Sequence, residues 1–220
     1  MASAECPTLA ALALALAGPP ALVVVAHRLF GVPRLDAQIV LQLVFCGFAV
    51  AVVSVVLRLE RLPLSSIGVR RPTGLTVASG LLVAAVTLYV LPLVTRPLVD
   101  ALHVGGLDAR TASLAALPAW FRVFLGVTSG AVEETLYRGY AIERLAAIAG
   151  RRWIGAAAAA IAFGLAHIPY WGVRFSLAAD LPFGIVMTLL YLWRRDLIAN
   201  AIAHGTGLVV SLLSLPGAAA

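Results

Sequence analysis

Seven long apolar segments, separated by short polar connections, dominate the sequence. They are Leu9–Ala26, Ala37–Leu57, Leu75–Thr95, Ser113–Gly130, Trp153–Tyr170, Phe175–Trp193 and Leu197–Leu215. Most of them approach the ~20 residues that a helix needs to cross the hydrocarbon core of a bilayer. Beyond Pro118 the fourth segment meets no further proline, so its helix is expected to continue to about Ala147. The pattern predicts an all-α, polytopic transmembrane helical bundle of about seven spans, within limits of six and eight.

Composition excludes two classes of function. With 62% hydrophobic and 12% charged residues, the chain cannot cover the surface of a soluble catalytic domain of any size. The formal net charge is +6, but there is no lysine and the arginines are dispersed, so no basic face for nucleic acid is expected. The chain is therefore predicted to be an integral membrane protein surrounded by membrane lipids. The lack of lysine is typical of a GC-rich bacterial genome, which favours a bacterial plasma membrane.

Arginines in the connections predict the orientation of the bundle. Nine lie in the second, fourth and sixth connections, and five lie in the first, third and fifth. The two groups are Arg58, Arg61, Arg70, Arg71, Arg144, Arg151, Arg152, Arg194 and Arg195, and Arg28, Arg34, Arg96, Arg110 and Arg174. Because short cytoplasmic loops carry the excess of positive residues, the even-numbered connections and the N-terminus are predicted to be cytoplasmic.

Few polar side chains fall inside the predicted spans, where each costs a few kcal/mol unless it is paired or hydrated. They are Glu133, Glu134 and Arg138 on the fourth helix, His167 on the fifth, and Asn200 and His204 on the seventh. Taken singly, a buried Glu–Arg pair or a lone histidine is as often structural as functional. Two adjacent carboxylates change this balance, because one arginine neutralises only one of them.

Helix geometry separates the roles of the two carboxylates. Glu134 and Arg138 are four residues apart and face each other, whereas Glu133 points about 100° away. A carboxylate left unpaired in an apolar site can accept a proton near neutral pH, as a general base must. With about 1.5 Å of rise per residue, Glu133 and His167 lie about 20 Å and 21 Å from the inner surface, and His204 about 12 Å. Small residues nearby permit close helix approach, so these three side chains are expected to share one cavity.

Three motifs, in this order, resemble those of a known family. Glu133 to Arg138 fits EExxxR, Phe163 to His167 fits FxxxH, and His204 on the last helix is the third element. The chain is similar to the CPBP family of intramembrane proteases, which includes the eukaryotic CAAX prenyl endopeptidases and bacterial homologues linked to bacteriocin immunity. Three motifs in order on membrane helices are more specific than any one of them.

The resemblance implies a membrane-embedded endopeptidase and a role for each motif residue. Glu133 would activate a water molecule for attack on a peptide carbonyl with the help of His167. Arg138 would hold Glu134, and His204 would help to stabilise the oxyanion. By analogy, the substrate would be a membrane-tethered protein or peptide, such as a prenylated one, that reaches an active site open to the cytoplasmic side.

The motifs also divide the chain. Residues 1–110 are expected to form about three N-terminal membrane helices that match the family only in hydropathy. Residues 111–220 are expected to form the catalytic-core helices. The segment 64–72, LSSIGVRRP, resembles the basic segment that many members carry ahead of this core.

One position departs from the family pattern. Members usually carry Asn or Asp four residues after the final histidine, where this chain has Leu208. Asn200, one turn before His204 on the same face, is the candidate to supply the missing donor. Asn200 and Phe163 are therefore the candidate substrate-binding residues, although Phe163 is expected chiefly to pack the ring of His167.

Two further polar residues receive structural interpretations. Tyr137 could be a hydroxyl donor, but a core position is favoured. Asp180 is expected near the outer interface, within reach of Arg174.

The sequence leaves the cofactor open. Glu133, His167 and His204 would also form a zinc site with a vacant position for water, with Glu134 as the base. A metal-free glutamate mechanism is slightly favoured, because no HExxH-like pair places two ligands on one helix. Two other functions stay open: a catalytically silent scaffold or bacteriocin-immunity protein of the same fold, and a proton-coupled carrier. The carrier ranks third, since the halves show no internal repeat.

Overall fold

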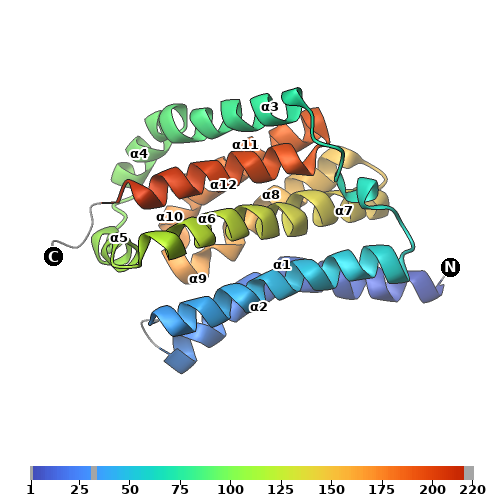
Figure 1. Ribbon diagram of the computed structural model, residues 1–220, viewed down its shortest axis with the longest axis horizontal. Coiled ribbons are helices and arrows are strands. Elements are labelled where there is room, and N and C mark those ends of the chain that lie inside the picture. Colours follow the sequence, from blue (N-terminus) through green and yellow to red (C-terminus); the bar gives the residue numbers. More distant parts are fainter. Residues whose placement is uncertain (1, 31–33, 216–220) are drawn as a thin grey trace.

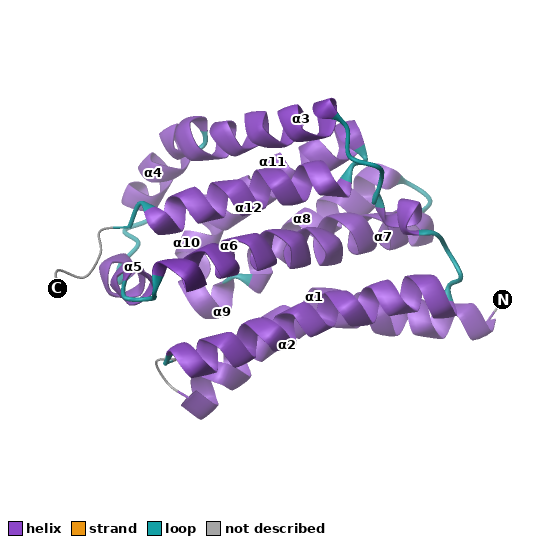
Figure 2. Cartoon of the chain, in the orientation of Figure 1, coloured by secondary structure: helices purple, strands orange, loops and turns teal. Residues whose placement is uncertain are grey.

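The computed structural model describes residues 2–30 and 34–215, and in that part of the chain every regular element is helical (Figure 2). The helices are α1 (Ala2–Phe30), α2 (Leu35–Ser54), α3 (Gly74–Ala85), α4 (Pro92–Ala101), α5 (Leu107–Ala115), α6 (Ala119–Glu133), α7 (Glu143–Ala149), α8 (Arg152–Ala166), α9 (Ile168–Trp171), α10 (Val173–Phe175), α11 (Leu181–Arg194) and α12 (Leu197–Leu213). The π-helical segments η1 (Val55–Leu59), η3 (Val86–Val90), η4 (Glu134–Ile142) and η5 (Ser176–Asp180) continue or join them, and η2 (Leu64–Ile67) is a 3₁₀ turn. The predicted all-α bundle is confirmed.

The apolar helices match the predicted membrane segments. Five are long and apolar enough to cross a bilayer: Cys6–Leu29, Leu35–Leu59, Gly74–Ala101, Arg152–Trp171 and Val173–Arg194. A sixth span is formed if α5 and Ala119–Ala149 count as one bent unit, and α12 is a shorter apolar helix. The seven predicted segments are thus mostly helical, with a break in the fourth, and the chain is a polytopic membrane protein.

The fourth predicted segment differs most from expectation. Its helix does continue through η4 and α7 to Ala149, but α5 lies at 112° to it and is a separate element. Pro118 stands at the N-cap of α6 with an extended backbone, ψ 144°. Its ring cannot continue a helix from α5, because it clashes with the preceding turn and offers no N–H. The span therefore begins at Ala119.

The last helix occupies the middle of the bundle. Figure 1 shows α12 between α3 and α6, with α8 and α11 behind them. The long helices α1 and α2 pack against each other and against the helix that contains α6 and η4. This arrangement brings the seventh predicted segment next to the fourth and the sixth.

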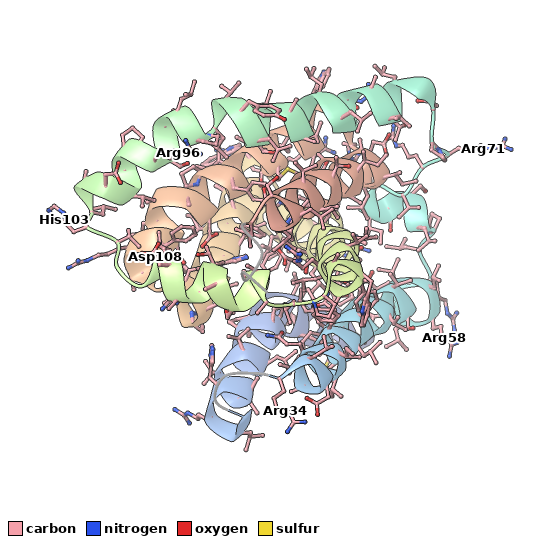
Figure 3. The ribbon with its side chains drawn as sticks, turned by 60° about the vertical axis from the view of Figure 1, so that its left-hand side comes forward. Arg34, Arg58, Arg71, Arg96, His103 and Asp108 are labelled. Carbon is pink, nitrogen blue, oxygen red and sulfur yellow. The ribbon has the colours of Figure 1, made fainter. Side chains whose placement is uncertain are left out.

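The connections gather at two ends of the bundle. Figure 3 shows Arg58 and Arg71 pointing away from one end, and Arg96, His103 and Asp108 pointing away from the other. We call the first the even end, because it carries the second, fourth and sixth connections, and the other the odd end.

Glycines let α6 and α12 approach with their backbones nearly in contact. A Cβ added at Gly130 would lie 2.6 Å from the backbone nitrogen of Gly205. A Cβ at Gly126 would lie 2.6 Å from a side-chain carbon of Val209 and 2.9 Å from its backbone nitrogen. The two helices can therefore lie at this distance only because those α6 positions have no side chain.

Polar contacts fix the even end of α12. Asp196 caps the helix by accepting hydrogen bonds from the backbone of Ile198 and Ala199, and it also accepts 2.7 Å from the hydroxyl of Thr76 on α3. The backbone N–H of Leu197 donates to the carbonyl of Gly68, 2.8 Å away. The basic segment singled out in the sequence thus contacts the start of the last helix.

A second anchor ties the α2–α3 connection to α7. Arg144 makes an ion pair with Glu60, with the closest nitrogen and oxygen 2.6 Å apart, and Tyr140 donates to the same carboxylate at 2.9 Å. Burial alone would raise the pKa of Glu60, but hydrogen bonds from Arg144, Thr8 and Tyr140 outweigh it and hold that pKa below its usual value. The carboxylate therefore stays charged at neutral pH and keeps its partners.

The α6–α12 contact predicts a selective sensitivity to added volume. Gly130→Ala should lower the free energy of unfolding by about 1–3 kcal/mol, because its methyl group would push two backbones apart. Gly47→Ala is the matched control, since a Cβ at Gly47 meets no atom within 4 Å. Thermal unfolding in detergent measures both. A Gly130→Ala variant as stable as Gly47→Ala would contradict the close approach.

Candidate active site

The EExxxR motif lies where α6 changes into a π-helical segment. Glu133 is the last residue of α6, and Glu134 begins η4, which also carries Arg138. π-Helical turns are rare and are frequent at functional sites. The two neighbouring carboxylates leave the helix in different directions, as their spacing predicts.

Glu134 is a fully buried carboxylate with three side-chain donors. Arg138 donates to Oε1 at 3.0 Å, and His204 Nδ1 lies 2.9 Å from the same oxygen. Asn200 donates to Oε2 at 3.1 Å. These contacts link η4 to two turns of α12, so Glu134 positions the residues around it rather than facing open space.

The donors of Glu134 are held in turn by α11. Arg138 also donates to the carbonyl of Gly184 at 3.0 Å, and Asn200 donates to the carbonyl of Met187 at 2.7 Å. A guanidinium and a carboxamide that bridge a carboxylate and a carbonyl have their positions fixed by both partners. Three elements, η4, α11 and α12, therefore meet at one carboxylate.

Glu133 has a different environment. Its Oε2 lies 3.8 Å from Nε2 of His167 and 3.9 Å from Nε2 of His204, both too far for a direct hydrogen bond. This oxygen is buried and has no hydrogen-bond partner. The structure thus brings together the carboxylate and the two histidines that the sequence singled out, with both nitrogens just beyond hydrogen-bonding distance of the carboxylate.

Both histidines present Nε2 to Glu133 because their Nδ1 atoms are used elsewhere. Nδ1 of His167 lies 2.8 Å from the carbonyl of Phe163, which can only accept, so Nδ1 carries a proton. Nδ1 of His204 faces the Glu134 carboxylate in the same manner. In its neutral form, each imidazole therefore directs a lone pair towards Glu133.

Phe163 packs this cluster together, as expected. Its ring lies 4.5 Å from the ring of His167, and the Arg138 guanidinium lies over it at 4.1 Å. Phe183 lies 4.8 Å from the ring of His204. Rings on both sides restrict the rotation of the two imidazoles.

A cavity of about 500 Å³ opens onto Glu133 and both histidines. Helices from both predicted regions of the chain line it, and it includes Phe163 and Leu208. Asn200 does not line it and is fully buried, so the predicted contact between Asn200 and substrate has no support in this placement. The cavity is also lined by residues of α5 and α9, by the last turns of α1 and by the first turn of α2, and these parts of the helices lie towards the odd end (Figure 1).

The residues predicted to hold a zinc ion were compared with what such a site needs. Ligands bonded about 2.0–2.1 Å from one tetrahedral zinc ion lie roughly 3.3 Å from one another. The separations from Glu133 to the histidines, 3.8 Å and 3.9 Å, exceed this. Across residues 2–30 and 34–215, no group of three or more His, Cys, Asp or Glu side chains is placed to hold a metal ion. As they stand, the three side chains do not fit a metal.

Two polar residues of the cavity were given structural interpretations in the sequence. Tyr137 and Asp180 both line it, and each has a buried oxygen without a hydrogen-bond partner. Asp180 lies within electrostatic range of His167 and Glu133. The sequence signal for Tyr137 is its position, one helical turn after Glu133.

Comparison with known proteins finds one family match. Residues 115–207 match the family described as type II CAAX prenyl endopeptidase Rce1-like. The matched stretch contains every motif residue from Glu133 to His204, and it confirms the resemblance found in the sequence. No curated protein and no solved structure matches the chain. The match supports a membrane-embedded peptidase.

The placement of Asn200 generates a test of its role. Asn200→Ala should lower the free energy of unfolding by about 1–3 kcal/mol, because Glu134 Oε2 and the Met187 carbonyl would both lose a buried donor. Thr188→Ala is a matched control on α11, because the Thr188 hydroxyl is buried without a partner. Chemical denaturation in detergent compares the two. Unchanged stability in Asn200→Ala, with a raised KM, would instead indicate contact with substrate.

Proposed function

On the premise that residues 115–207 belong with the type II CAAX prenyl endopeptidase Rce1-like proteins, we propose that this chain is an intramembrane endopeptidase of the glutamate type. One observation carries the proposal: the unpartnered Oε2 of Glu133 lies 3.8 Å and 3.9 Å from Nε2 of His167 and His204, and all three residues line the cavity. A carboxylate and two imidazoles arranged in this way can bind, deprotonate and orient a water molecule.

The first chemical step is the activation of that water. A water between Glu133 Oε2 and His167 Nε2 would bridge their separation of 3.8 Å by donating to one or both. Glu133 takes a proton as the water oxygen attacks the carbonyl carbon of the scissile peptide bond. Glu133 then gives this proton to the leaving nitrogen, and the C–N bond breaks to yield a carboxyl and an amine. The enzyme ends in its starting protonation state.

His204 and Glu134 support the attack. The Glu134 carboxylate holds Nδ1 of His204 and so aims Nε2 at the site; with a proton on Nε2, this ring would donate to the oxyanion that forms on the carbonyl. Arg138 neutralises Glu134 and Asn200 restrains it, so neither is proposed to touch the substrate. Both are positioning residues.

One carboxylate and two imidazoles are a donor set that zinc uses, but as they stand these three side chains are too far apart for the ion. When bound to such a set, zinc would lower the pKa of a water molecule. The separations in this structure would have to shorten before that could happen, so the proposed steps use the side chains alone.

We further propose that the substrate is a protein or peptide tethered to the membrane near its scissile bond, such as a prenylated C-terminal peptide. The cavity is lined mainly by apolar side chains from α1, α2, α8 and α12, and a lipid-like chain can enter such a space from the bilayer. The alternative is a catalytically silent scaffold or immunity protein of the same fold. The apolar Leu208 at the family's carboxamide position is the observation that favours the alternative.

The proposal predicts that Glu133→Gln abolishes peptide cleavage without unfolding the protein. The amide keeps the volume but cannot accept a proton, so kcat for a quenched fluorescent farnesylated CAAX-type peptide should fall by at least about 10³-fold. Glu143→Gln is the control: Glu143 pairs with Arg195 outside the cavity, so its loss should lower thermal stability and leave kcat unchanged.

Zinc chelation separates the two chemistries in the same assay. Cleavage that persists under chelation but is lost in Glu133→Gln supports the glutamate mechanism. Chelator sensitivity restored by added zinc would replace it with a metal mechanism. A wild-type protein that cleaves no peptide would favour the silent scaffold.

The side from which substrate enters is a separate proposal. The cavity extends to the odd end, but the arginine count predicts that the even end is cytoplasmic. Both predictions cannot hold, because the cavity would then open on the side of the membrane opposite the cytoplasm. We propose the cytoplasmic opening. The arginine count, nine against five, favours the opposite orientation, so the cytoplasmic opening rests on the side from which a tethered substrate would arrive. A substrate tethered by a prenyl group would reach the bundle from the cytoplasmic leaflet.

Single cysteines at the two ends test this orientation. Gly105→Cys and Arg151→Cys, each in a chain with Cys6 and Cys46 replaced by alanine, place one thiol at the odd end and one at the even end. A membrane-impermeant maleimide should label Gly105→Cys in inside-out vesicles and Arg151→Cys in intact spheroplasts. The reverse pattern would overturn the cytoplasmic opening and support the arginine count.

A further inference from the structure

We propose that the hydroxyl of Tyr137 is a catalytic hydrogen-bond donor that binds the carbonyl oxygen of the scissile bond as it becomes an oxyanion. This inference rests on the proposed peptidase function and adds a residue to its site. It assigns to Tyr137 the role that the family resemblance gives to the side chain four residues after His204, a position that Leu208 holds in this chain.

The first support is a comparison among three fully buried tyrosines. The hydroxyl of Tyr140 donates to Glu60 at 2.9 Å, and that of Tyr191 donates to Glu143 at 3.1 Å. Tyr137 is only 1% exposed, yet its hydroxyl has no hydrogen-bond partner. A buried hydroxyl without a partner costs about 1–3 kcal/mol of stability, a cost that phenylalanine would avoid. The stability of the fold therefore does not explain why this position carries a hydroxyl.

The second support is its position. Tyr137 lies one helical turn after Glu133, lines the same cavity, and is close enough to interact electrostatically with the Glu133 carboxylate. Its ring stands edge-on to Phe163, with centroids 5.3 Å apart and planes at 87°. Phe163 in turn contacts the ring of His167. The aromatic contacts fix the phenol beside the residues proposed to activate water.

The third support is that other candidates for this donor are unsuitable. Both hydrogen-bonded contacts of the Asn200 amide nitrogen are made away from the cavity, to Glu134 and Met187. Leu208 lines the cavity but has no polar atom. The carboxylate of Asp180, when ionised, accepts hydrogen bonds only and would repel an oxyanion. Tyr137 is a neutral donor whose proton is not already committed.

The chemical contribution of Tyr137 is a hydrogen bond and not a proton transfer. The phenol keeps its proton while negative charge grows on the carbonyl oxygen and declines again when the C–N bond breaks. A donor that is already oriented strengthens its bond in the transition state more than in the bound substrate, so it lowers the barrier with little effect on substrate affinity.

The test is Tyr137→Phe, which removes one oxygen and keeps the ring. With the farnesylated CAAX-type peptide, kcat should fall about 10²-fold to 10³-fold, with KM changed less than about twofold. Thermal stability should stay equal or rise, because no hydrogen bond of the fold is lost. Tyr191→Phe is the matched control and should show the opposite pattern: a lower unfolding temperature, since its bond to Glu143 is lost, and an unchanged kcat.

The outcomes separate this inference from the proposed function. If wild type and Tyr137→Phe cleave equally while Glu133→Gln is inactive, the role of Tyr137 is overturned and the peptidase function stands. If Tyr137→Phe loses stability together with activity, the hydroxyl is structural and the inference is again overturned. If wild type does not cleave the peptide, or Glu133→Gln cleaves it as wild type does, the proposed function fails and the inference fails with it.

Discussion

The carboxylate of Glu134 is the point on which the arrangement of the site depends. It is fully buried, and a buried charge is tolerated only when it is paired and hydrogen-bonded. Its partners come from its own π-helical segment and from α12, and two of them are also held by carbonyls of α11. Because each partner would lose a buried hydrogen bond without Glu134, these elements hold one another in a single relative position. The orientation of His204 follows from that position.

Satisfying Glu134 leaves its neighbour without a partner. Arg138 has one formal charge, and its guanidinium is bonded to Glu134 and to Gly184. Glu133 therefore keeps an unpartnered oxygen in the centre of the bundle, opposite two histidines. Two identical side chains at adjacent positions thus have different environments, because the helix directs Glu134 towards its donors and Glu133 towards the histidines; the proposed chemical role falls to Glu133.

The sequence predicted the membrane helices and the meeting of Glu133, His167 and His204, because both depend on local periodicity and on where a membrane tolerates charge. It placed His204 about 8 Å shallower than Glu133, since a depth counted from helix ends ignores tilt and the true start of each helix. Only the structure shows how α12 packs against α6 through Gly130.

Side-chain direction was harder to predict. Asn200 occupies the expected face of α12, but its amide is taken by Glu134 and Met187, and neither contact leaves a sequence pattern. The direction of the cavity was equally hidden, because it depends on which ends of several helices separate.

The two ends of the bundle are stabilised differently, and this difference bears on how a substrate could enter. The even end contains the Glu60–Arg144 and Glu143–Arg195 ion pairs and the Asp196 cap of α12. The cavity lies towards the other end. Anchors at one end hold the register of α6, α7 and α12 and therefore the geometry of the motif residues. A substrate that enters from the odd end would displace side chains that line the cavity but not those anchors. The motif residues, which come from three distant segments, would then keep their positions when the cavity is occupied.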